Sequence, residues 1–250
     1  MRRKLAFLFS LALGCATPVP GPAIAQTGLA SPLAQAGEIP SYKPPLRGAP
    51  GGRVSGASRA VSPGATSSSI ELLAPDRHAG VTANAAPNLY YFISGPVTLP
   101  LKFTLSAPMQ PAPVVDANLV PPGQAGIRKI RLADYRVQLQ PGISYKWSVS
   151  VVVDPRSPSN DIVASATLVL DAPDPAIENA ARSAPPLRRA VLFARGGFWY
   201  DAVAAAVEGQ DADQHAALDA LLDQVGLTGP AAYDRRAAQE GSHSRRLPGN

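Results

Sequence analysis

The chain has 250 residues, of which 46% are hydrophobic and 16% charged, and its formal net charge is +5. This length allows one domain with a substantial buried core and an appendage. The single cysteine excludes an intramolecular disulfide, so stability must come from buried apolar surface.

The N-terminus has the pattern of an export signal. Basic residues 2–4 precede an apolar run at 5–13 that is too short to span a bilayer, and Ala23-Ile24-Ala25 fits a signal peptidase site. We therefore expect residues 1–25 to be a signal peptide and the protein to be periplasmic or secreted. The alternative is a lipoprotein anchored through Cys15, although Ala12 stands where leucine is preferred in a lipidation motif.

Removal of this leader changes the expected partners. The leader holds three of the 23 basic residues and no acidic one, so the remaining chain is close to neutral. Its charge therefore gives no reason to expect nucleic acid as a partner. No transmembrane span is expected after the leader is removed.

The composition predicts a disordered segment at each end of the remaining chain. Residues 26–67 are rich in proline, glycine, alanine and serine, and they cannot bury enough apolar surface to offset the entropy of ordering. We expect them to form a tether. Residues 229–250 are polar and arginine-rich, and we expect them to form a disordered tail.

Residues 68–172 have the pattern of an all-β domain. Short apolar or alternating runs separated by turn residues predict seven or eight strands, at 70–73, 89–93, 97–105, 114–120, 127–132, 136–139, 143–153 and 162–170. After Pro141-Gly142, the alternation of Tyr145, Trp147 and the valines to Val153 predicts a half-buried strand. The entry Leu-x-Pro-Gly-x-x-Tyr resembles the tyrosine corner of immunoglobulin-like and fibronectin-type sandwiches. We therefore expect a β-sandwich of that class.

Residues 173–228 have helical periodicity. Asp174-Pro175 is a start signal, Gly196-Gly197 ends the next helix, Asp213 is expected to cap a later one, and Gly226 follows its apolar stripe. The stretch 194–203 resembles the turn and second-helix start of a tetratricopeptide repeat, which implies a small helical hairpin packed on the β-domain.

Three blocks together resemble the uncharacterised bacterial family called domain of unknown function 928. They are residues 73–92, residues 139–164 and residues 189–202. The chain lacks a cysteine near 53–59, and it has Tyr91 where tryptophan is frequent. The resemblance implies an exported protein with a β-domain and a helical tail, and it implies no activity.

Few polar residues form a pattern that indicates chemistry. In Asp76-Arg77-His78, His78 is a candidate general base or metal ligand, but neighbours in an extended segment point to opposite faces and a loop is the simpler interpretation. Asp154, Arg156, Asn160 and Asp161 share a loop that favours turn geometry over Ca²⁺ binding. No cofactor, metal site or catalytic residue is predicted.

Six acidic residues between Asp201 and Asp223 form either an internally paired solvated face or a docking surface for a basic partner. We expect a non-enzymatic envelope protein that binds or scaffolds another envelope protein through Phe198, Trp199 and Tyr200. A carbohydrate-binding or adhesive sandwich, with Tyr90, Tyr91 and Trp147 stacking on a glycan, is the alternative. An uncharacterised hydrolase is a third hypothesis.

Overall fold

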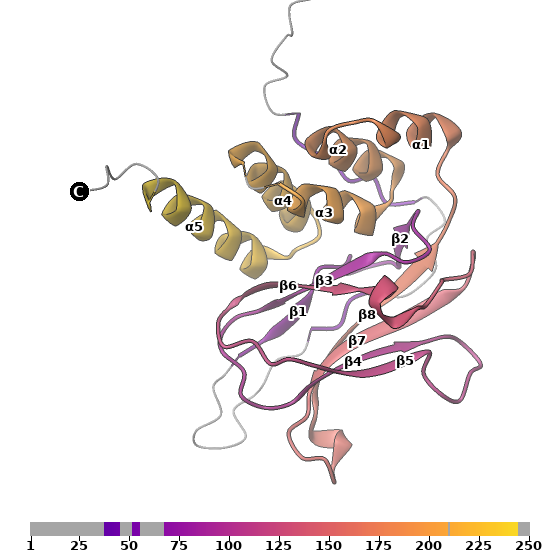
Figure 1. Cartoon of the computed structure of the whole chain (residues 1–250), viewed down its shortest axis with the longest axis vertical. Helices are drawn as coiled ribbons and strands as arrows, with labels where there is room; N and C mark the ends of the chain where they lie inside the picture. Colours follow the sequence, from indigo (N-terminus) through magenta and orange to yellow (C-terminus); the bar gives the residue numbers. More distant parts are fainter. Residues whose placement is uncertain (1–37, 46–51, 56–67, 210, 245–250) are drawn as a thin grey trace, which may run out of the picture. The chain divides into compact units, whose positions relative to one another are not determined.

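The computed structural model describes residues 38–45, 52–55, 68–209 and 211–244 (Figure 1). All of them belong to one of the two compact units of the chain, residues 36–250. The predicted signal peptide, and the parts of the predicted tether at 26–37, 46–51 and 56–67, lie outside the described residues.

The described chain is mixed β plus α, with two sheets and five α-helices. The three-stranded sheet has the order β1-β3-β6, with β1 at Ile70–Leu72, β3 at Asn88–Ile93 and β6 at Gly126–Arg131. The five-stranded sheet has the order β2-β8-β7-β4-β5, with bounds Gly80–Thr82, Ile162–Leu170, Ser144–Val151, Leu101–Ser106 and Val115–Leu119. The pair β2–β8 is parallel and the other ladders are antiparallel.

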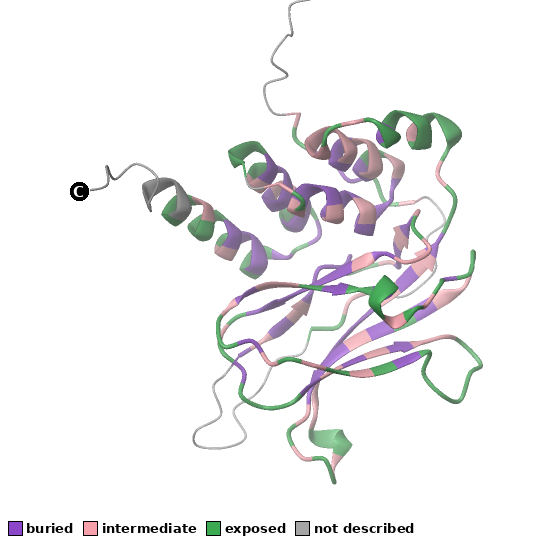
Figure 2. Cartoon of the chain, in the orientation of Figure 1, coloured by how far each residue is buried: buried purple, intermediate pink, exposed green. Residues whose placement is uncertain are grey.

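Strand β3 is covered on both faces, which explains its unbroken apolar sequence (Figure 2). Side chains alternate across a strand, so Tyr90 and Phe92 share one face. The Phe92 ring contacts Tyr233 of a helix, with 5.4 Å between ring centroids, and this face is therefore the one covered by helices. Leu89, Tyr91 and Ile93 are buried on the opposite face.

Strand β7 forms where the alternation predicts it. Gly142 adopts a φ of +74°, and the hydroxyl of Tyr145 accepts a hydrogen bond of 3.1 Å from the backbone N–H of Gln140. Trp147, Val149 and Val151 follow on the same buried face, while Val153 lies beyond the strand end and is exposed. The tyrosine bond to upstream backbone is the contact expected at this corner.

The helices are α1 at Pro175–Arg182, α2 at Pro186–Gly196, α3 at Trp199–Val207, α4 at Ala212–Gln224 and α5 at Thr228–Ser244. The Asp174 side chain caps α1 by accepting from the Ala176 N–H at 2.7 Å. Gly197, at a φ of +84°, ends α2 as predicted. Asp211, rather than the predicted Asp213, caps α4 by accepting from the Gln214 N–H.

Several predicted boundaries are wrong. The prediction of a disordered tail at 229–250 is wrong for residues 229–244, which belong to α5, a helix whose Tyr233 and Ala231 pack against the rest of the domain. Residues 245–250 lie outside the described residues. The predicted strand at 136–139 is absent from the described residues there, because a 3₁₀ turn at Leu132–Tyr135 precedes Arg136 in a left-handed conformation. Strand β2 is not among the predicted strands.

Two parts of the predicted tether are ordered on the domain. Val54 exchanges backbone hydrogen bonds with Ser165 of β8, at 2.7 and 2.9 Å. Tyr42 is 8% exposed, and Lys43 donates its backbone N–H to the carbonyl of Ala194 at 3.0 Å. Composition alone does not predict these contacts, because they are made by single residues in a segment that otherwise consists mostly of small residues and prolines.

Candidate functional site

The aromatic triplet predicted to bind a partner is inside the protein. Phe198, Trp199 and Tyr200 are 6%, 0% and 1% exposed. Trp199 donates its indole N–H to the carbonyl of Leu73 at 2.8 Å. The Tyr200 hydroxyl accepts from the Trp147 indole at 2.9 Å and donates to the carbonyl of Thr167 at 3.1 Å. This corrects the expectation that the triplet is available on the surface. Trp199 and Tyr200 bond groups of the β-domain, and the Phe198 ring meets Phe193 of helix α2 edge-on.

The aromatics considered for glycan stacking are buried as well. Tyr90 and Tyr91 are each 4% exposed and Trp147 is fully buried. A sugar ring cannot stack on these faces while the domain is folded.

Within the described residues, five of the six acidic side chains between Asp201 and Asp223 have internal partners. Asp201 accepts from the Ala83 N–H, Glu208 pairs with Arg189, Asp211 caps its helix, and Asp219 and Asp223 both face Arg235. This arrangement agrees with the internally paired interpretation rather than with a docking surface for a basic partner.

The residues Asp76, Arg77 and His78 do not converge. Asp76 and Arg77 form an exposed ion pair at 3.5 Å. His78 instead bonds the hydroxyl of Tyr42 through Nε2 at 2.8 Å. Partial burial lowers the pKa of His78, and the nearby Asp76 opposes that effect. The histidine is therefore part of a contact with the segment at residues 38–45.

Segment 38–45 lies along a surface that we call the docking surface, formed by His78, Arg188, Ala194, Arg195, Trp199 and Gln224. Tyr42 is the central contact. Its ring lies nearly parallel to the His78 ring, with centroids 5.8 Å apart, and meets Trp199 edge-on at 4.9 Å. Burial raises the pKa of the Tyr42 hydroxyl well above its ordinary value, so it stays protonated.

One side-chain amide holds the backbone of this segment. Gln224 accepts the Tyr42 N–H at 2.8 Å through Oε1 and donates through Nε2 to the carbonyl of Pro40 at 3.0 Å. An amide presents a donor and an acceptor side by side, so it matches the polar groups of extended backbone. The bond from the Lys43 N–H to the Ala194 carbonyl continues the same contact.

The start of the segment is held by charge. The carboxylate of Glu38 pairs with Arg188 through one oxygen and with Arg195 through the other. The two guanidinium groups come from one face of helix α2, seven residues apart in sequence. Glu38 and Tyr42 therefore give the segment a charged and an aromatic anchor, with the Gln224 amide between them.

The loop at 154–161 has turn geometry. Asp154 accepts from the Arg156 N–H at 2.9 Å, and Asp161 accepts from the Val153 N–H at 3.1 Å. Both carboxylates thus bond backbone, as the turn interpretation expects. In the part of the chain that the structure describes, no group of three His, Cys, Asp or Glu residues is placed to hold a metal ion.

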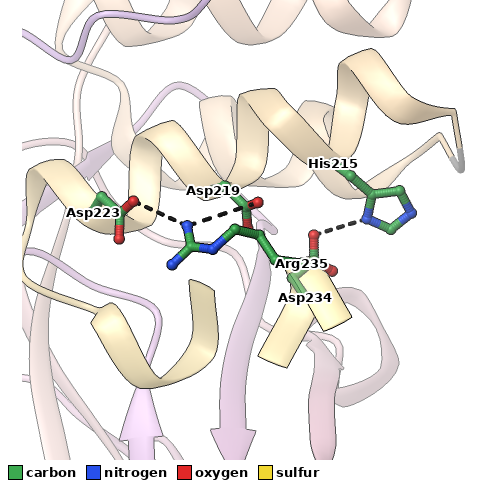
Figure 3. A network of polar contacts seen from close by, with 5 residues as sticks. All are labelled: His215, Asp219, Asp223, Asp234 and Arg235. Carbon is green, nitrogen blue, oxygen red and sulfur yellow. Dashed lines mark hydrogen bonds and ion pairs between the residues drawn. The ribbon is translucent and has the colours of Figure 1, made fainter. Parts of the chain in front are cut away.

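A second polar cluster joins helices α4 and α5 (Figure 3). His215 bonds Asp234 through Nδ1 at 2.8 Å, and Arg235 reaches Asp223 at 3.1 Å and Asp219 at 3.8 Å. Asp219 is 9% exposed, and its Oδ1 has no hydrogen-bond partner among the described residues. Burial and the neighbouring Asp234 raise the pKa of Asp219 to about 6.

This pKa predicts a pH-dependent stability. The folded pKa lies above the ordinary 3.8, so the contribution of Asp219 is fully present below about pH 4 and is lost as the pH rises through about 6. Asp219→Asn, which cannot ionise, is expected to raise the free energy of unfolding at pH 8 by ~1 kcal/mol relative to the parent protein. That difference should disappear near pH 4 in urea titrations.

Asp223→Asn is the matched control, because it removes the more exposed carboxylate bonded to the same Arg235. It is expected to change stability by less than ~0.5 kcal/mol. An Asp219→Asn protein that is less stable than the parent at pH 8 would contradict the assignment.

A search against protein-family models matches residues 54–234 to the Domain of Unknown Function (DUF928) family. The match covers most of the chain, and it includes both sheets and helices α1–α4. The chain belongs to this family. No curated protein matches the sequence, and no helix in the described part of the chain is long and apolar enough to cross a membrane.

Proposed function

We propose that this protein is a non-enzymatic peptide-binding module of the cell envelope, and that the docking surface recognises an extended segment carrying glutamate and tyrosine four residues apart. The observation that carries this proposal is the Gln224 amide, which bonds both the Pro40 carbonyl and the Tyr42 N–H. Backbone bonds of this kind bind any extended peptide, and side-chain pockets then select the sequence.

Selectivity would come from the two anchors. The paired guanidinium groups of Arg188 and Arg195 complement one carboxylate, and arginine is suited to such fixed geometry. The surface formed by Trp199 and His78 accepts one aromatic ring. In this chain its own segment 38–45 occupies the surface.

The boundaries of the family match separate the docking surface from the segment that covers it. All six residues of the docking surface lie within the matched range 54–234, whereas segment 38–45 lies outside it. The matched range of this chain therefore contains the whole docking surface, and the segment that covers it lies outside that range. A segment of the same chemistry from an envelope partner would compete for the same contacts.

The test is a titration of a fluorescent peptide of residues 38–45 into the full chain carrying Tyr42→Ala. The variant's own segment loses its aromatic anchor, so the peptide is expected to bind it at least tenfold more tightly than it binds the parent protein. The reason is that a tethered segment competes at an effective concentration on the order of millimolar. Fluorescence anisotropy gives both dissociation constants.

Two controls make the titration specific. A peptide with alanine at the position of Tyr42 should not bind, and Gln224→Ala added to the Tyr42→Ala protein should abolish binding by removing the backbone contacts. Glu38→Ala serves as the second weakened variant if Tyr42→Ala does not fold. Equal affinity for parent and variant proteins, or no binding to either variant, would refute the proposal.

We further propose an immunoglobulin-like class for the sandwich and a tetratricopeptide-like pairing for helices α2 and α3. The first is supported by the bond between the Tyr145 hydroxyl and the Gln140 N–H. The second is supported by the turn at Gly197 and by the fully buried Ala202, a small residue that allows close helix approach. Export is supported by the leader pattern of residues 1–25.

A further inference from the structure

Strand β5 forms a free edge of the five-stranded sheet. It is the last strand in the sheet order, and it lies on the side of the domain away from the helices (Figure 1). One side of its backbone pairs with β4, where Leu105 is opposite Val115 and Leu101 is opposite Leu119. Among the described residues, no other backbone group bonds the backbone of residues 115–119. The outer N–H and C=O groups of β5 are therefore open to pairing with a strand of another chain.

The sequence of this edge reads nearly the same in both directions. From Pro113 to Pro121 it is Pro-Val-Val-Asp-Ala-Asn-Leu-Val-Pro, and Ala117 is the midpoint. Residues at equal distances from the midpoint have similar chemistry: proline with proline, valine with valine, valine with leucine, and aspartate with the isosteric asparagine. Two antiparallel copies related by a two-fold axis at Ala117 place these matched residues opposite each other.

The two faces of the strand also match under this symmetry. The inward face carries three buried or half-buried residues, namely Val115, Ala117 and Leu119. The outward face carries four exposed residues, namely Val114, Asp116, Asn118 and Val120. Directly opposite residues of an antiparallel pair lie on the same face of the sheet. Pairing about Ala117 therefore brings Val114, which is 36% exposed, against Val120 of the other copy, which is 88% exposed in the single chain.

Charge selects this register over its neighbours. Asp116 is the only charged residue between the two prolines, and it pairs with Lys102 of β4 at 3.0 Å. Pairing about Ala117 sets Asp116 opposite Asn118 of the other copy, whose amide can donate to the carboxylate. An axis at residue 116 sets two aspartates opposite each other, which is destabilising. An axis at residue 118 sets Asp116 against the exposed Val120.

The prolines limit the pairing without preventing it. Proline lacks the N–H that a ladder needs, so it protects a sheet edge when it stands within the strand. Here Pro113 and Pro121 stand at equivalent positions outside the seven residues 114–120. They end the ladder at the same place in both copies, so they restrict pairing to this segment.

We propose that two copies of this protein associate through β5, antiparallel about a two-fold axis at Ala117, and form one continuous sheet. Because each copy uses the same edge, the interface is complete in a dimer and adds no third copy. One strand pair is a small interface, so the association is weak and depends on protein concentration. No residue of the docking surface lies in β4 or β5, so this inference is independent of the peptide-binding proposal.

The register is tested by disulfide crosslinking of the full chain in a Cys15→Ser background. The protein carrying both Val114→Cys and Val120→Cys is expected to form a covalent dimer on mild oxidation with copper phenanthroline. The reason is that each thiol faces the other position of the second copy, at a Cα separation of about 4.5–5.5 Å. Val114→Cys alone and Val120→Cys alone are the matched controls. Their two thiols lie on the order of 20 Å apart in the dimer, so neither should crosslink.

Sedimentation equilibrium of the full chain tests the association without crosslinking. Asn118→Asp is expected to weaken dimerisation on the order of tenfold, because it opposes two aspartates twice in the dimer. Adding Asp116→Asn to this variant should restore the parent affinity, since each aspartate again faces an asparagine and Lys102 is directly opposite position 118. Asn160→Asp makes the same change of charge in the exposed loop between β7 and β8, and it should leave dimerisation unchanged.

Four results would overturn the proposal. The first two are a covalent dimer of either single-cysteine variant and the absence of one in the double variant. The third is an Asn118→Asp protein that dimerises as the parent does, because the association then uses another surface. The fourth is a parent protein that sediments as a monomer at concentrations up to about 1 mM.

Discussion

Replacing Trp199 with alanine is expected to lower the free energy of unfolding by about 3–5 kcal/mol. The side chain is fully buried, its indole N–H donates to the Leu73 carbonyl at 2.8 Å, and its ring meets Tyr42 edge-on. The substitution creates a cavity where α3, the β-domain and segment 38–45 meet. Urea denaturation of parent and variant proteins measures the loss, which is a large share of the roughly 5–15 kcal/mol typical of a domain.

Trp199→Phe and Val163→Ala are informative comparisons. Phenylalanine keeps most of the apolar volume and removes the hydrogen bond, so about 1–2 kcal/mol should be lost. Val163 is 43% exposed, and its truncation should change stability by less than ~0.5 kcal/mol. If Trp199→Ala were as mild as Val163→Ala, Trp199 would not join the two parts of the domain as described.

A methyl group added at Gly80 is expected to cost about 1–3 kcal/mol because the site has no room for it. A Cβ placed there would lie 2.5 Å from Cε2 of Tyr200. The Tyr200 ring cannot move away easily, since its hydroxyl is bonded to both the Trp147 indole and the Thr167 carbonyl. Gly80→Ala should therefore separate strand β2 from helix α3, with a lower midpoint of thermal unfolding.

Gly123→Ala is the matched control for this substitution. A Cβ at Gly123 has no neighbouring atom within 4 Å, so the change should stay within ~0.5 kcal/mol of the parent. If the two alanine variants were equally stable, the contact between β2 and α3 would accommodate an added methyl group without cost. That result would contradict the close approach of Gly80 to the Tyr200 ring.

Sequence patterns locate the elements that depend on local periodicity. The alternation after Pro141-Gly142 predicts β7, and the pairing of aspartate with proline at 174–175 predicts the start of α1. Strand β2 escapes prediction because it has three residues and its parallel partner β8 lies almost ninety residues later in the chain. Helix α5 escapes because its polar sequence is ordered by a few contacts, such as Tyr233 on Phe92, rather than by a long apolar stripe.

The candidate site is predictable only in part. His78 and Trp199 stand out in the sequence, but nothing there shows that both contact Tyr42. That contact depends on a proline-rich segment that is held by Glu38 and Tyr42. Their partners Arg188, Arg195 and Gln224 lie 150, 157 and 182 residues later in the chain. The prediction that the aromatic triplet lies on the surface is wrong for a related reason. Tryptophan and tyrosine occur both at interfaces and in cores, and internal acceptors such as the Leu73 carbonyl decide between the two.

The burial of β3 on two faces has a consequence for synthesis. The residues of its outer face, Tyr90 and Phe92, have been synthesised when the ribosome passes residue 93. The last of the helices that cover this face is α5, which starts only at residue 228. At the usual rate of translation this interval lasts on the order of ten seconds. During that time an aromatic strand face is open to other nascent chains. Any truncation before the helices would make this exposure permanent, so the β-domain and the helices must be synthesised as one piece.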